Sequence, residues 1–231
     1  MSAHLQIAID GPAAAGKTTV ARAVAQRLGA LYLDTGAMYR ALAYLALRSG
    51  TDVDNGAALS RLANDAHMNV MLDSNAPLGF RISGAGHEFD ERDLQSAQVT
   101  AIVSTVAAQP EVRAAMVQAQ RRIAGESAVV MAGRDIGTVV LPNAPVKIYL
   151  TASHAARIER RRAQLEQSGV DVDQHRLAQE IDERDRLDKT RSISPLEPAP
   201  DARVIDSSDV DAANVVDQIC AMAALVTGKQ R

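Results

Sequence analysis

The feature that most constrains this chain is a loop pattern near its start. Residues Gly11 to Thr18 fit the pattern G-x-x-x-x-G-K-[ST], with a short apolar run before it and a helical pattern after it. The two glycines let the backbone turn so that successive N–H groups point inward around phosphate oxygens, and the following helix N-terminus adds positive potential. Lys17 can reach the β- and γ-phosphates, and the Thr18 hydroxyl can bind Mg²⁺. The pattern therefore predicts a nucleoside triphosphate site. The alternative is a glycine-containing strand–helix turn of any α/β protein, which is the weaker interpretation because the flanks are also those the motif requires.

The flanks of this loop also indicate the fold class. Residues 5–9 form a short apolar run typical of a buried strand in a parallel sheet. The helix that begins at Lys17 carries Val20, Val24 and Leu28 on one face and is followed by Gly29. A strand, loop and helix in this order predict an open α/β fold whose mostly parallel sheet binds ligands at the carboxyl ends of its strands.

The rest of the chain continues this alternation with one interruption. Further buried strands are expected at residues 31–33, 127–131, 146–150 and 203–206, and helices at 34–50, 54–65, 93–108, 110–125, around 157–162, from about 173, and at 212–226. Three short strands, at 67–73, 78–83 and 87–89, are separated by strong turn signals. We therefore expect a small antiparallel insertion at about residues 51–97.

Charge and cysteine content exclude several classes of protein. The net charge of −3 gives no bulk reason to expect a nucleic acid or an acidic membrane as a partner. The single cysteine, Cys220, excludes an intrachain disulfide and lies in an apolar helical pattern, so we expect a buried thiol in a reducing compartment. The N-terminal apolar run breaks at Asp10 and lacks a basic flank, and no apolar run reaches the roughly 20 residues that span a bilayer. We expect a cytoplasmic protein, and no exposed apolar repeat demands a partner, so we expect a monomer.

Two further segments at strand ends suggest a second phosphate-bearing ligand. Tyr39 and Arg40 lie about one turn into the helix that follows residues 31–33, with Asp34 or Thr35 as its N-cap. Arg134 and Asp135 follow the strand at 127–131, and the planar fork of an arginine can grip a phosphate. The alternatives are a solvated helix residue for Arg40 and an internal ion pair for Arg134 and Asp135.

Residues 153–195 contain two helices rich in charged residues of both signs. Acidic and basic residues alternate, so this segment is no electropositive nucleic-acid patch. One interpretation is a pair of solvated helices held by side-chain pairs four residues apart. The other is a mobile lid whose arginines close over a transferring phosphoryl group and exclude water. Composition leaves both interpretations open.

Several of these segments together resemble the bacterial cytidylate kinases. The similar blocks are Ile9-Asp10-Gly11-Pro12 with Gly16-Lys17, Leu33-Asp34-Thr35-Gly36-Ala37-Met38-Tyr39-Arg40, Gly133-Arg134-Asp135-Ile136-Gly137-Thr138-Val139-Val140, Pro142-Asn143-Ala144-Pro145-Val146-Lys147-Ile148-Tyr149-Leu150, and Glu183-Arg184-Asp185 through Arg191. The similarity extends over nearly the whole chain. The second and third blocks are far more specific than the phosphate loop, which many NTPases share.

The resemblance implies a fold, a reaction and a set of site residues. The fold is a P-loop NTPase-type parallel sheet flanked by helices, with a small antiparallel monophosphate-binding insertion and a helical lid. The reaction is ATP + CMP (or dCMP) ⇌ ADP + CDP (or dCDP), with Mg²⁺ accompanying ATP. The ATP-binding residues would be Gly11, Pro12, Ala13, Ala14, Ala15, Gly16, Lys17, Thr18 and Thr19, with Thr18 on the metal.

The resemblance also assigns residues to the monophosphate. Arg40, Arg134 and Arg191 would hold the CMP phosphate, with Tyr39 beside them; Ser104, Arg113 and Asp135 would read the cytosine edge; and Thr35 and Asp188 would bind the sugar. Arg184, with Arg157 or Arg161 from the lid, would stabilise the γ-phosphoryl during transfer, so the catalytic set is Lys17, Arg134, Arg184, Arg191 and Arg157. From the residues alone, Ser104 and Arg113 would be taken for ordinary surface residues.

The expected domain organisation follows the same resemblance. The P-loop core would comprise residues 1–36, 127–152 and 196–231, the monophosphate-binding region residues 37–126, and the lid residues 153–195. Two rival functions remain: a kinase of this fold for another monophosphate such as UMP or AMP, and a non-catalytic nucleotide-binding module.

Two positions depart from the family pattern. Ala13 stands where the family commonly has serine, and Ala132 where it commonly has an acidic residue. A carboxylate at that second position often organises magnesium through water. Asp10 or Asp135 is a candidate to compensate for its loss.

Overall fold

A central parallel sheet forms the frame of the molecule. The computed structural model describes residues 4–73, 75–76, 79–167, 169, 172–191 and 193–228. Within these residues the main sheet has five strands, all parallel, in the order β2-β6-β1-β7-β8. Their bounds are Gln6–Asp10 for β1, Leu31–Asp34 for β2, Val129–Gly133 for β6, Val146–Thr151 for β7 and Arg203–Asp206 for β8. The expected α/β fold with a parallel sheet is confirmed.

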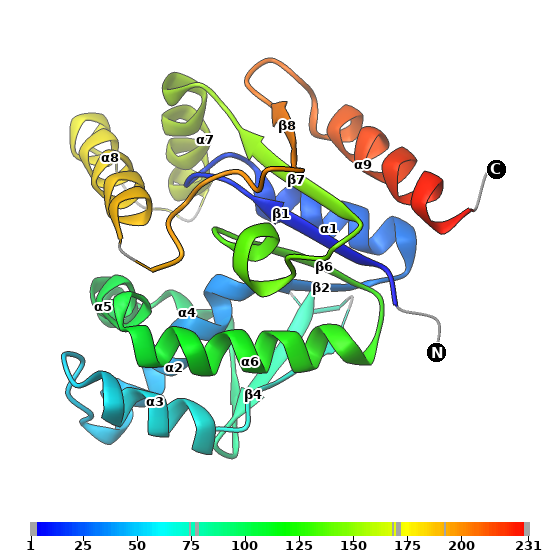
Figure 1. The fold of residues 1–231 in the computed structure, drawn as a ribbon. Helices are drawn as coiled ribbons and strands as arrows, with labels where there is room; N and C mark the ends of the chain where they lie inside the picture. The colour runs from blue at the N-terminus through cyan, green and yellow to red at the C-terminus, as the bar shows by residue number, and fades with distance from the viewer. Residues whose placement is uncertain are drawn as a thin grey trace.

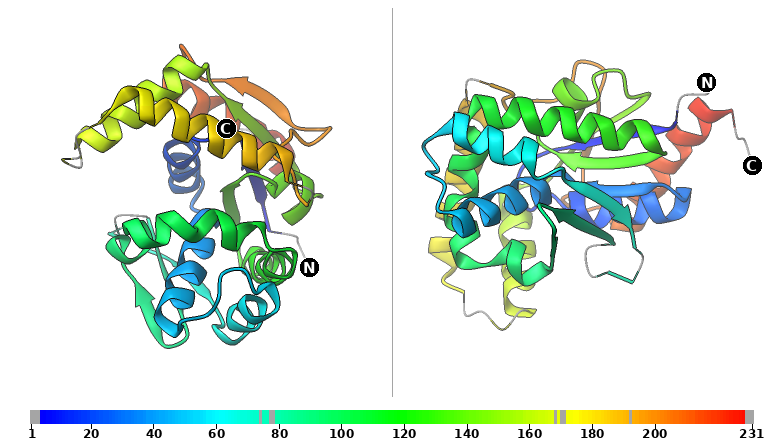
Figure 2. Two further views of the ribbon diagram at one scale, coloured as in Figure 1. Left: turned by 90° about the vertical axis from the view of Figure 1, so that its left-hand side faces the viewer. Right: turned by 90° about the horizontal axis from the view of Figure 1, so that it is seen from below.

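The sheet is covered on both faces, as its apolar strands require. Ile7, Ala8 and Ile9 of the central strand have no exposed surface, which fits strands that carry apolar residues on both sides. Helices α1 (Lys17–Leu28) and α9 (Ala212–Thr227) pack together against one face. Helix α6 (Pro110–Glu126) lies on the other face in the views of Figures 1 and 2.

The expected antiparallel insertion is also present. Strands β3 (Asn69–Leu72), β4 (Phe80–Gly84) and β5 (His87–Phe89) form a three-stranded antiparallel sheet. It packs near α2 (Thr35–Ser49), and α3 (Gly56–Asp65) precedes it in the chain. The expected strand at 78–83 begins, like part of its preceding turn, outside the described residues.

One expected helix is wrong. The single helix expected at 93–108 is two helices, α4 (Glu91–Gln95) and α5 (Ala97–Ala108). Ser96 between them has extended backbone angles, and its hydroxyl accepts a hydrogen bond from the Val99 N–H, so it acts as the N-cap of α5. The α helical periodicity continues on both sides of Ser96, which hid the break.

The segment after β6 differs from the expected loop. The strand continues to Gly133, and a π-helical turn, η1, spans Ile136–Val140. Buried Asp10 at the end of β1 accepts hydrogen bonds from the N–H groups of Ile136 and Gly137, at 2.8 and 2.7 Å. This long-range contact fixes the wider turn, and π-helical turns are often found at functional sites.

Two helices rise beside the carboxyl edge of the sheet. Helices α7 (His154–Gln167) and α8 (Gln174–Thr190) lie on one side of that edge, and α2 to α5 lie on the other (Figures 1 and 2). Part of the break expected at 167–169 falls outside the described residues. Asp173 caps α8 by accepting from two backbone N–H groups.

Two smaller expectations concern burial. Cys220 is half-buried beside the core rather than fully buried, because it lies at the margin of the α9 face. No helix in the described part of the chain is long and apolar enough to cross a membrane.

Candidate active site

The phosphate loop connects β1 to α1 and has a backbone that tolerates few substitutions. At Gly11 an added Cβ would lie 1.9 Å from the Leu150 carbonyl oxygen of the neighbouring strand, so only glycine fits. Gly16 is the N-cap of α1 in the left-handed region (φ 88°), and in this fully described stretch no side chain caps the helix. The first N–H groups of α1 are therefore free to bind an anion.

Lys17 is buried at the base of this loop. Its Nζ donates a hydrogen bond of 2.6 Å to the Pro12 carbonyl oxygen. Burial lowers the pKa of the Lys17 ammonium well below its usual value, and the positive charges of Arg134 and Arg184 lower it further, against the opposing charge of Asp34. Because nearby anions favour a protonated amine, bound phosphate oxygens would raise the pKa of Lys17 again.

Arg40 extends from α2 toward the same edge of the sheet. Its Nη1 donates to the Leu94 carbonyl oxygen and to the Thr100 hydroxyl, both at 3.1 Å, so α4 and α5 hold the guanidinium in place. Burial lowers the pKa of Arg40, the charge of Asp34 raises it, and the charge of Arg161 on α7 lowers it. Arg40 and Arg161 thus act on each other from opposite sides of the site.

Arg134 and Arg191 share a carboxylate. Arg134 Nε donates to Asp188 Oδ2 at 2.7 Å, and Arg191 Nη1 lies 3.7 Å from Asp188 Oδ1. Burial opposes the charge of Asp188, but the charge and hydrogen bond of Arg134 prevail and hold the pKa of that carboxyl below its usual value. One acidic residue of α8 therefore orients an arginine that follows β6 and another that caps α8.

A second ion pair lies deeper, between α6 and the end of β6. Arg113 and Asp135 are joined by a short hydrogen bond and are 3% and 5% exposed. Tyr39 lies with its ring centroid 5.7 Å from the Arg113 guanidinium. Burial raises the pKa of Tyr39 to about 12, so its hydroxyl remains a donor at neutral pH.

Several buried donors around this pair lack a partner. Among the described residues, Arg113 Nε, Gln120 Nε2 and Arg191 Nη2 are buried without a hydrogen bond. Buried polar groups are nearly always paired in native proteins. Arg191 Nη2 lies 3.9 Å from Asp135 Oδ1, too far for a hydrogen bond. These buried donors can therefore bind the acceptor groups of a polar ligand.

One arginine of α8 and one of α7 are less firmly held than those above. Arg184 has exposed surface and makes no hydrogen bond or ion pair with any described residue. Desolvation of the guanidinium by the surrounding protein, together with the positive charge of Arg134, lowers the pKa of Arg184 to about 10. Arg161 on α7 donates to Gln164 of its own helix at 2.8 Å.

Arg157 is placed differently from these two. Its guanidinium pairs with Asp185 of α8 and donates to the Ala13 carbonyl oxygen of the phosphate loop at 3.2 Å. Asp185 in turn accepts from the Ala13 N–H at 3.1 Å. Arg160, one turn later on α7, donates to Ser207, whose hydroxyl donates to the Ala15 carbonyl oxygen at 3.2 Å.

The carboxylates near the phosphate loop have distinct tasks. Asp10 is occupied by two backbone N–H groups, and burial raises its pKa to about 6 despite them. Asp135 is occupied by Arg113. Asp34 is the register partner of Ala132 in the β2–β6 pair, so its side chain projects from the same face of the sheet as the Ala132 methyl group. Its charge acts on Lys17, Arg40 and Arg184.

Some predicted residues stand apart from these contacts. Ser104 of α5 is exposed, and Thr18 and Thr19 are exposed at the start of α1. Thr35 is buried and donates to the Ala132 carbonyl oxygen at 3.0 Å. The structure brings together the arginines, Lys17, Tyr39, Asp135 and Asp188, and leaves these hydroxyls at the margin.

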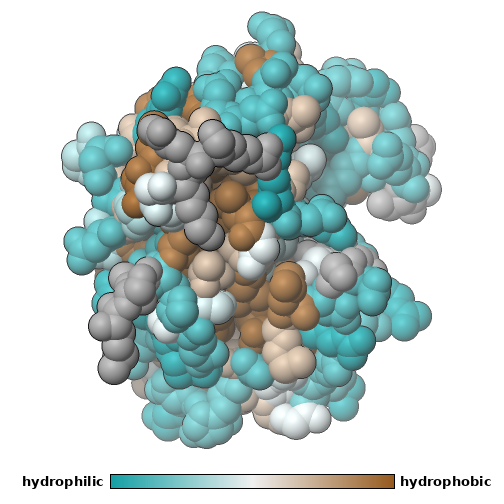
Figure 3. Space-filling model, turned by 90° about the vertical axis from the view of Figure 1, so that its right-hand side faces the viewer, coloured by the Kyte–Doolittle hydropathy of each residue, from teal (hydrophilic) through white to brown (hydrophobic). Residues whose placement is uncertain are grey.

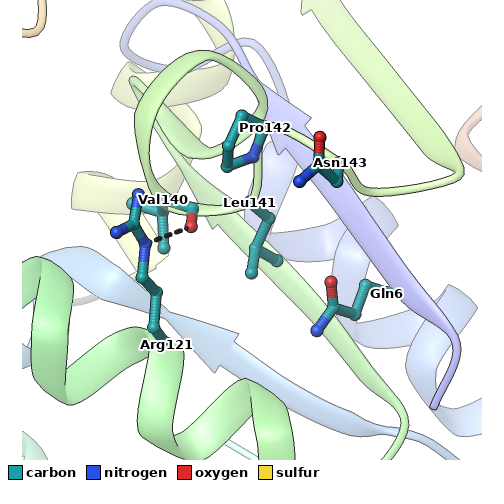
Figure 4. Close-up of a pocket in the computed structure, with 6 residues that line it drawn as sticks. All are labelled: Gln6, Arg121, Val140, Leu141, Pro142 and Asn143. Atoms are coloured by element: carbon teal, nitrogen blue, oxygen red, sulfur yellow. Dashed lines mark hydrogen bonds between the residues drawn. The ribbon is translucent and has the colours of Figure 1, made fainter. Parts of the chain in front are cut away.

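Two hollows lie at the opposite edge of the sheet. One, of about 320 Å³, is lined by Gln6, Arg121 and residues 140–143, with Arg121 bound to the Val140 carbonyl oxygen (Figure 4). Another, of about 350 Å³, is lined partly by Leu31, Val70 and Ala128. Figure 3 shows apolar side chains gathered on the face that carries the chain ends. Both hollows lie at the amino ends of strands, far from the charged groups.

Sequence reasoning missed three residues of this site. Gln120 and Asp185 are polar residues whose burial, 1% and 6% exposed, cannot be read from a helical pattern. Asp34 was considered only as a helix cap, which it is, through the Gly36 N–H. The signal that could have found Gln120 is its spacing of seven from Arg113, which places both on one face of α6.

Comparison with known proteins agrees with this geometry. The family model described as cytidylate kinase matches residues 7–225. A cytidylate kinase of Pelotomaculum thermopropionicum is 49% identical over 96% of each chain, and one of Mycobacterium avium is 44% identical over 95% of each. A bifunctional pantoate ligase/cytidylate kinase of Synechococcus is 47% identical over 92% of this chain and 39% of that protein.

Among solved structures, an uncharacterized protein of Eubacterium ventriosum has the same general fold. Its TM-score is 0.51 at 14% identity, covering 95% of this chain and 98% of the other. That likeness concerns the fold alone. The match to the family model over nearly the whole chain, and relatives above 40% identity at nearly full length, show that the chain belongs to the cytidylate kinase family.

Proposed function

We propose that this protein transfers the γ-phosphoryl group of ATP to CMP or dCMP and releases ADP with CDP or dCDP. The observation that carries the proposal is that two groups of phosphate-binding residues lie at the same edge of the sheet. One is the loop with Lys17 and the free N–H groups of α1. The other is the set of arginines at positions 40, 134 and 191, held by fixed acceptors.

Charge neutralisation is the main task of this arrangement. In phosphoryl transfer the protein supplies little covalent chemistry and mostly aligns two phosphates and stabilises spreading negative charge. The positive charges of Arg134 and Arg184 lower the pKa of Lys17, and the charge of Arg134 also lowers the pKa of Arg184. Substrate phosphates would relieve that repulsion, so binding of both nucleotides is favoured by the same cations. No protein nucleophile or general base is needed, because the phosphate of CMP is already an anion.

The buried Arg113–Asp135 pair supports recognition of a base with both donors and acceptors. Asp135 accepts and Arg113 donates, and the orphan donors on Arg113, Gln120 and Arg191 surround them. A cytosine edge carries an amino donor beside a carbonyl and a ring-nitrogen acceptor, which suits this set. Ser104, Thr35 and Asp188 complete the proposed contacts to base and sugar, and Tyr39 packs beside them.

Magnesium is proposed to accompany ATP at the start of α1. Thr18 is an exposed residue there. The charges of Asp34 and Asp10 both raise the pKa of Lys17. Asp34 accepts from the Gly36 N–H, whereas Asp10 is held by two backbone N–H groups. Asp10 and Asp135 are engaged elsewhere, so Asp34 is the better substitute for the acidic residue absent at Ala132. The ion, when bound, would neutralise charge on the β- and γ-phosphates.

We propose the same division of labour between parts of the chain. Residues 1–36, 127–152 and 196–231 serve as the core that binds ATP, residues 37–126 bind the monophosphate, and residues 153–195 act as a lid. The proposal is supported by Arg134 and Asp135 at the core reaching both Arg113 of the second part and Asp188 of the third. We also propose that the protein works as a monomer in the cytoplasm.

A coupled assay of ADP release tests the proposed activity. The purified protein would be supplied with MgATP and CMP, dCMP, UMP or AMP in turn. We expect rapid release with CMP or dCMP and at least roughly a hundredfold lower kcat/KM with UMP and AMP, because the buried donor–acceptor pair would be mismatched. Preference for UMP or AMP would reassign the substrate, and tight ATP binding without transfer would indicate a binding module.

A further inference from the structure

Two side chains of α7 and α8 hold both backbone polar groups of one phosphate-loop residue, Ala13, and are called the clamp below. Asp185 of α8 accepts from the Ala13 N–H at 3.1 Å, and Arg157 of α7 donates to the Ala13 carbonyl oxygen at 3.2 Å. The two side chains also bind each other. All three residues are less than a tenth exposed. Arg157 and Asp185 lie well over a hundred residues after Ala13 in the sequence. They thus fix a backbone segment that carries no functional side chain of its own.

The next residue explains why this segment needs to be held. Ala14 has φ 57°, in the left-handed region that residues with a Cβ rarely adopt. Such a conformation persists only where the surroundings over-determine it, and these sites cluster where ligands bind. In the described loop the clamp on Ala13 is immediately N-terminal to the strained residue, so it is well placed to supply that constraint.

The clamp also limits what Arg157 can do. Its charge is matched by Asp185, and reaching a γ-phosphoryl group would break both the ion pair and the bond to Ala13. Arg161 lies one turn further along α7 and acts electrostatically on Arg40 across the site. Among the described residues, its one hydrogen bond is to Gln164 of its own helix. Of the two lid arginines that the family resemblance offered, Arg161 is the one with freedom to reach phosphate.

We propose that Asp185 and Arg157 are positioning residues that clamp the backbone N–H and C=O of Ala13 and so hold the strained phosphate loop ready for ATP, while Arg161 contacts the transferring phosphoryl group. This inference rests on the proposed binding of ATP by that loop. It makes the lid a structural support of the ATP site as well as its cover. Movement of α7 or α8 is thereby coupled to the shape of the loop.

The test compares nucleotide affinity in variants of the clamp. Binding of ADP, measured by calorimetry without monophosphate, reports on the loop independently of catalysis. Asp185→Ala removes both bonds from the carboxylate and should weaken ADP binding about tenfold, the scale expected from releasing a strained residue. Asp185→Asn keeps an acceptor for the Ala13 N–H and should weaken binding less. The KM for CMP should change by less than about twofold in both.

A second arm separates loop positioning from general destabilisation. Ala14→Gly removes the strain, because glycine adopts positive φ freely. Asp185→Asn and Asp185→Ala should therefore weaken ADP binding less in an Ala14→Gly background than in the parent chain. A purely structural role for Asp185 would give the same loss in both backgrounds. The melting temperature of each variant shows whether it is folded during the measurement, and Asp185→Asn serves if Asp185→Ala does not fold.

A matched control lies on the same helix. Asp182 of α8 pairs with His154 of α7 at 2.8 Å, also joining the two lid helices, but it is 62% exposed and does not touch the loop. Asp182→Ala should leave ADP affinity unchanged. The proposal is overturned if Asp185→Asn and Asp185→Ala bind ADP as the parent does, or if KM for CMP rises as much as the ADP dissociation constant. Failure of the parent protein to bind ADP would instead refute the proposed function.

Discussion

The two phosphate sites proposed for this molecule differ in the chemical groups that form them. The ATP side is mostly backbone: N–H groups of α1, glycines at 11 and 16, and one buried lysine. The CMP side is mostly long side chains from α2, α6, the end of β6 and the end of α8, each held by an acceptor from another element. One site is local in sequence and the other is assembled from segments up to about a hundred and fifty residues apart.

This difference determines which substitutions are expected to disrupt each site. A backbone cradle depends on loop conformation, so single side-chain changes matter chiefly at Lys17 and at the residues that hold the loop. A side-chain site depends on mutual orientation, since each arginine is fixed by a carboxylate or carbonyl. Loss of one member leaves its partner buried and unpaired, which is the larger part of the cost.

The largest effect is expected at Lys17, the one side chain essential to the backbone-built site. Lys17→Ala should lower kcat by about 10³-fold or more, because it removes a preorganised charge from the transferring phosphates. The coupled ADP-release assay measures this. Lys189→Ala, an exposed lysine on α8, is the control and should retain full activity. Near-normal turnover in Lys17→Ala would remove the loop from the mechanism.

The next largest effect tests the side-chain site. Arg134→Ala should raise the KM for CMP about a hundredfold and leave the KM for ATP within a few fold, because the phosphate contact is lost and Asp188 loses the nearer of its two arginine partners. Arg134→Lys keeps a charge but not the planar fork, and should recover only part of the loss. Steady-state kinetics with each substrate varied in turn give both constants. Unchanged use of CMP by Arg134→Ala would contradict the assignment.

A smaller effect is expected at the lid, where the two sites meet. Arg161→Ala should lower kcat roughly 30-fold with ADP affinity unchanged, at the low end for lost charge stabilisation because Arg184 remains. Arg157→Ala should instead weaken ADP binding. Single-turnover rates and calorimetry on the two variants separate these outcomes. The reverse pattern would assign Arg157 to the phosphoryl group and leave the clamp unexplained.

The smallest effect concerns the metal. Asp34→Asn preserves the helix cap, since asparagine caps as well as aspartate, but removes the charge facing Lys17. Manganese bound together with ADP, followed by electron paramagnetic resonance, should be held about tenfold less tightly, the scale of an outer-shell ligand. Asp34→Asn combined with Ala132→Asp should regain affinity. Equal manganese binding by the parent and by Asp34→Asn would show that Asp34 does not help to hold the metal.

Much of the fold could be predicted because its signals are local. The parallel strands, the insertion and the long helices follow from apolar runs and turn residues. The break at Ser96 and the π-helical turn at Ile136–Val140 could not be predicted. The first is hidden by continuous apolar periodicity, and the second depends on Asp10, which lies more than a hundred residues earlier.

The candidate site divides in the same way. The loop motif alone indicated the triphosphate, but Ser104 and Arg113 were singled out only through resemblance to a family. Three features follow neither from the loop motif nor from the family resemblance and are seen only in the structure. They are the burial of Gln120, the register of Asp34 beside Ala132, and the hydrogen bond between Asp185 and the Ala13 N–H. Each of these depends on contacts between distant segments, and a single sequence does not encode them in any local pattern.

The direction of the parallel strands has a consequence for how this enzyme can be joined to others. Strand β1 points toward the phosphate loop, and the amino end of β1 and the carboxyl end of α9 both lie away from that loop (Figure 1). A fused neighbour at either end would leave the substrate entrance open. The Synechococcus relative, in which a matching segment is part of a larger bifunctional protein, is an arrangement this geometry permits. Affinity tags and fusion partners should be tolerated at both ends for the same reason.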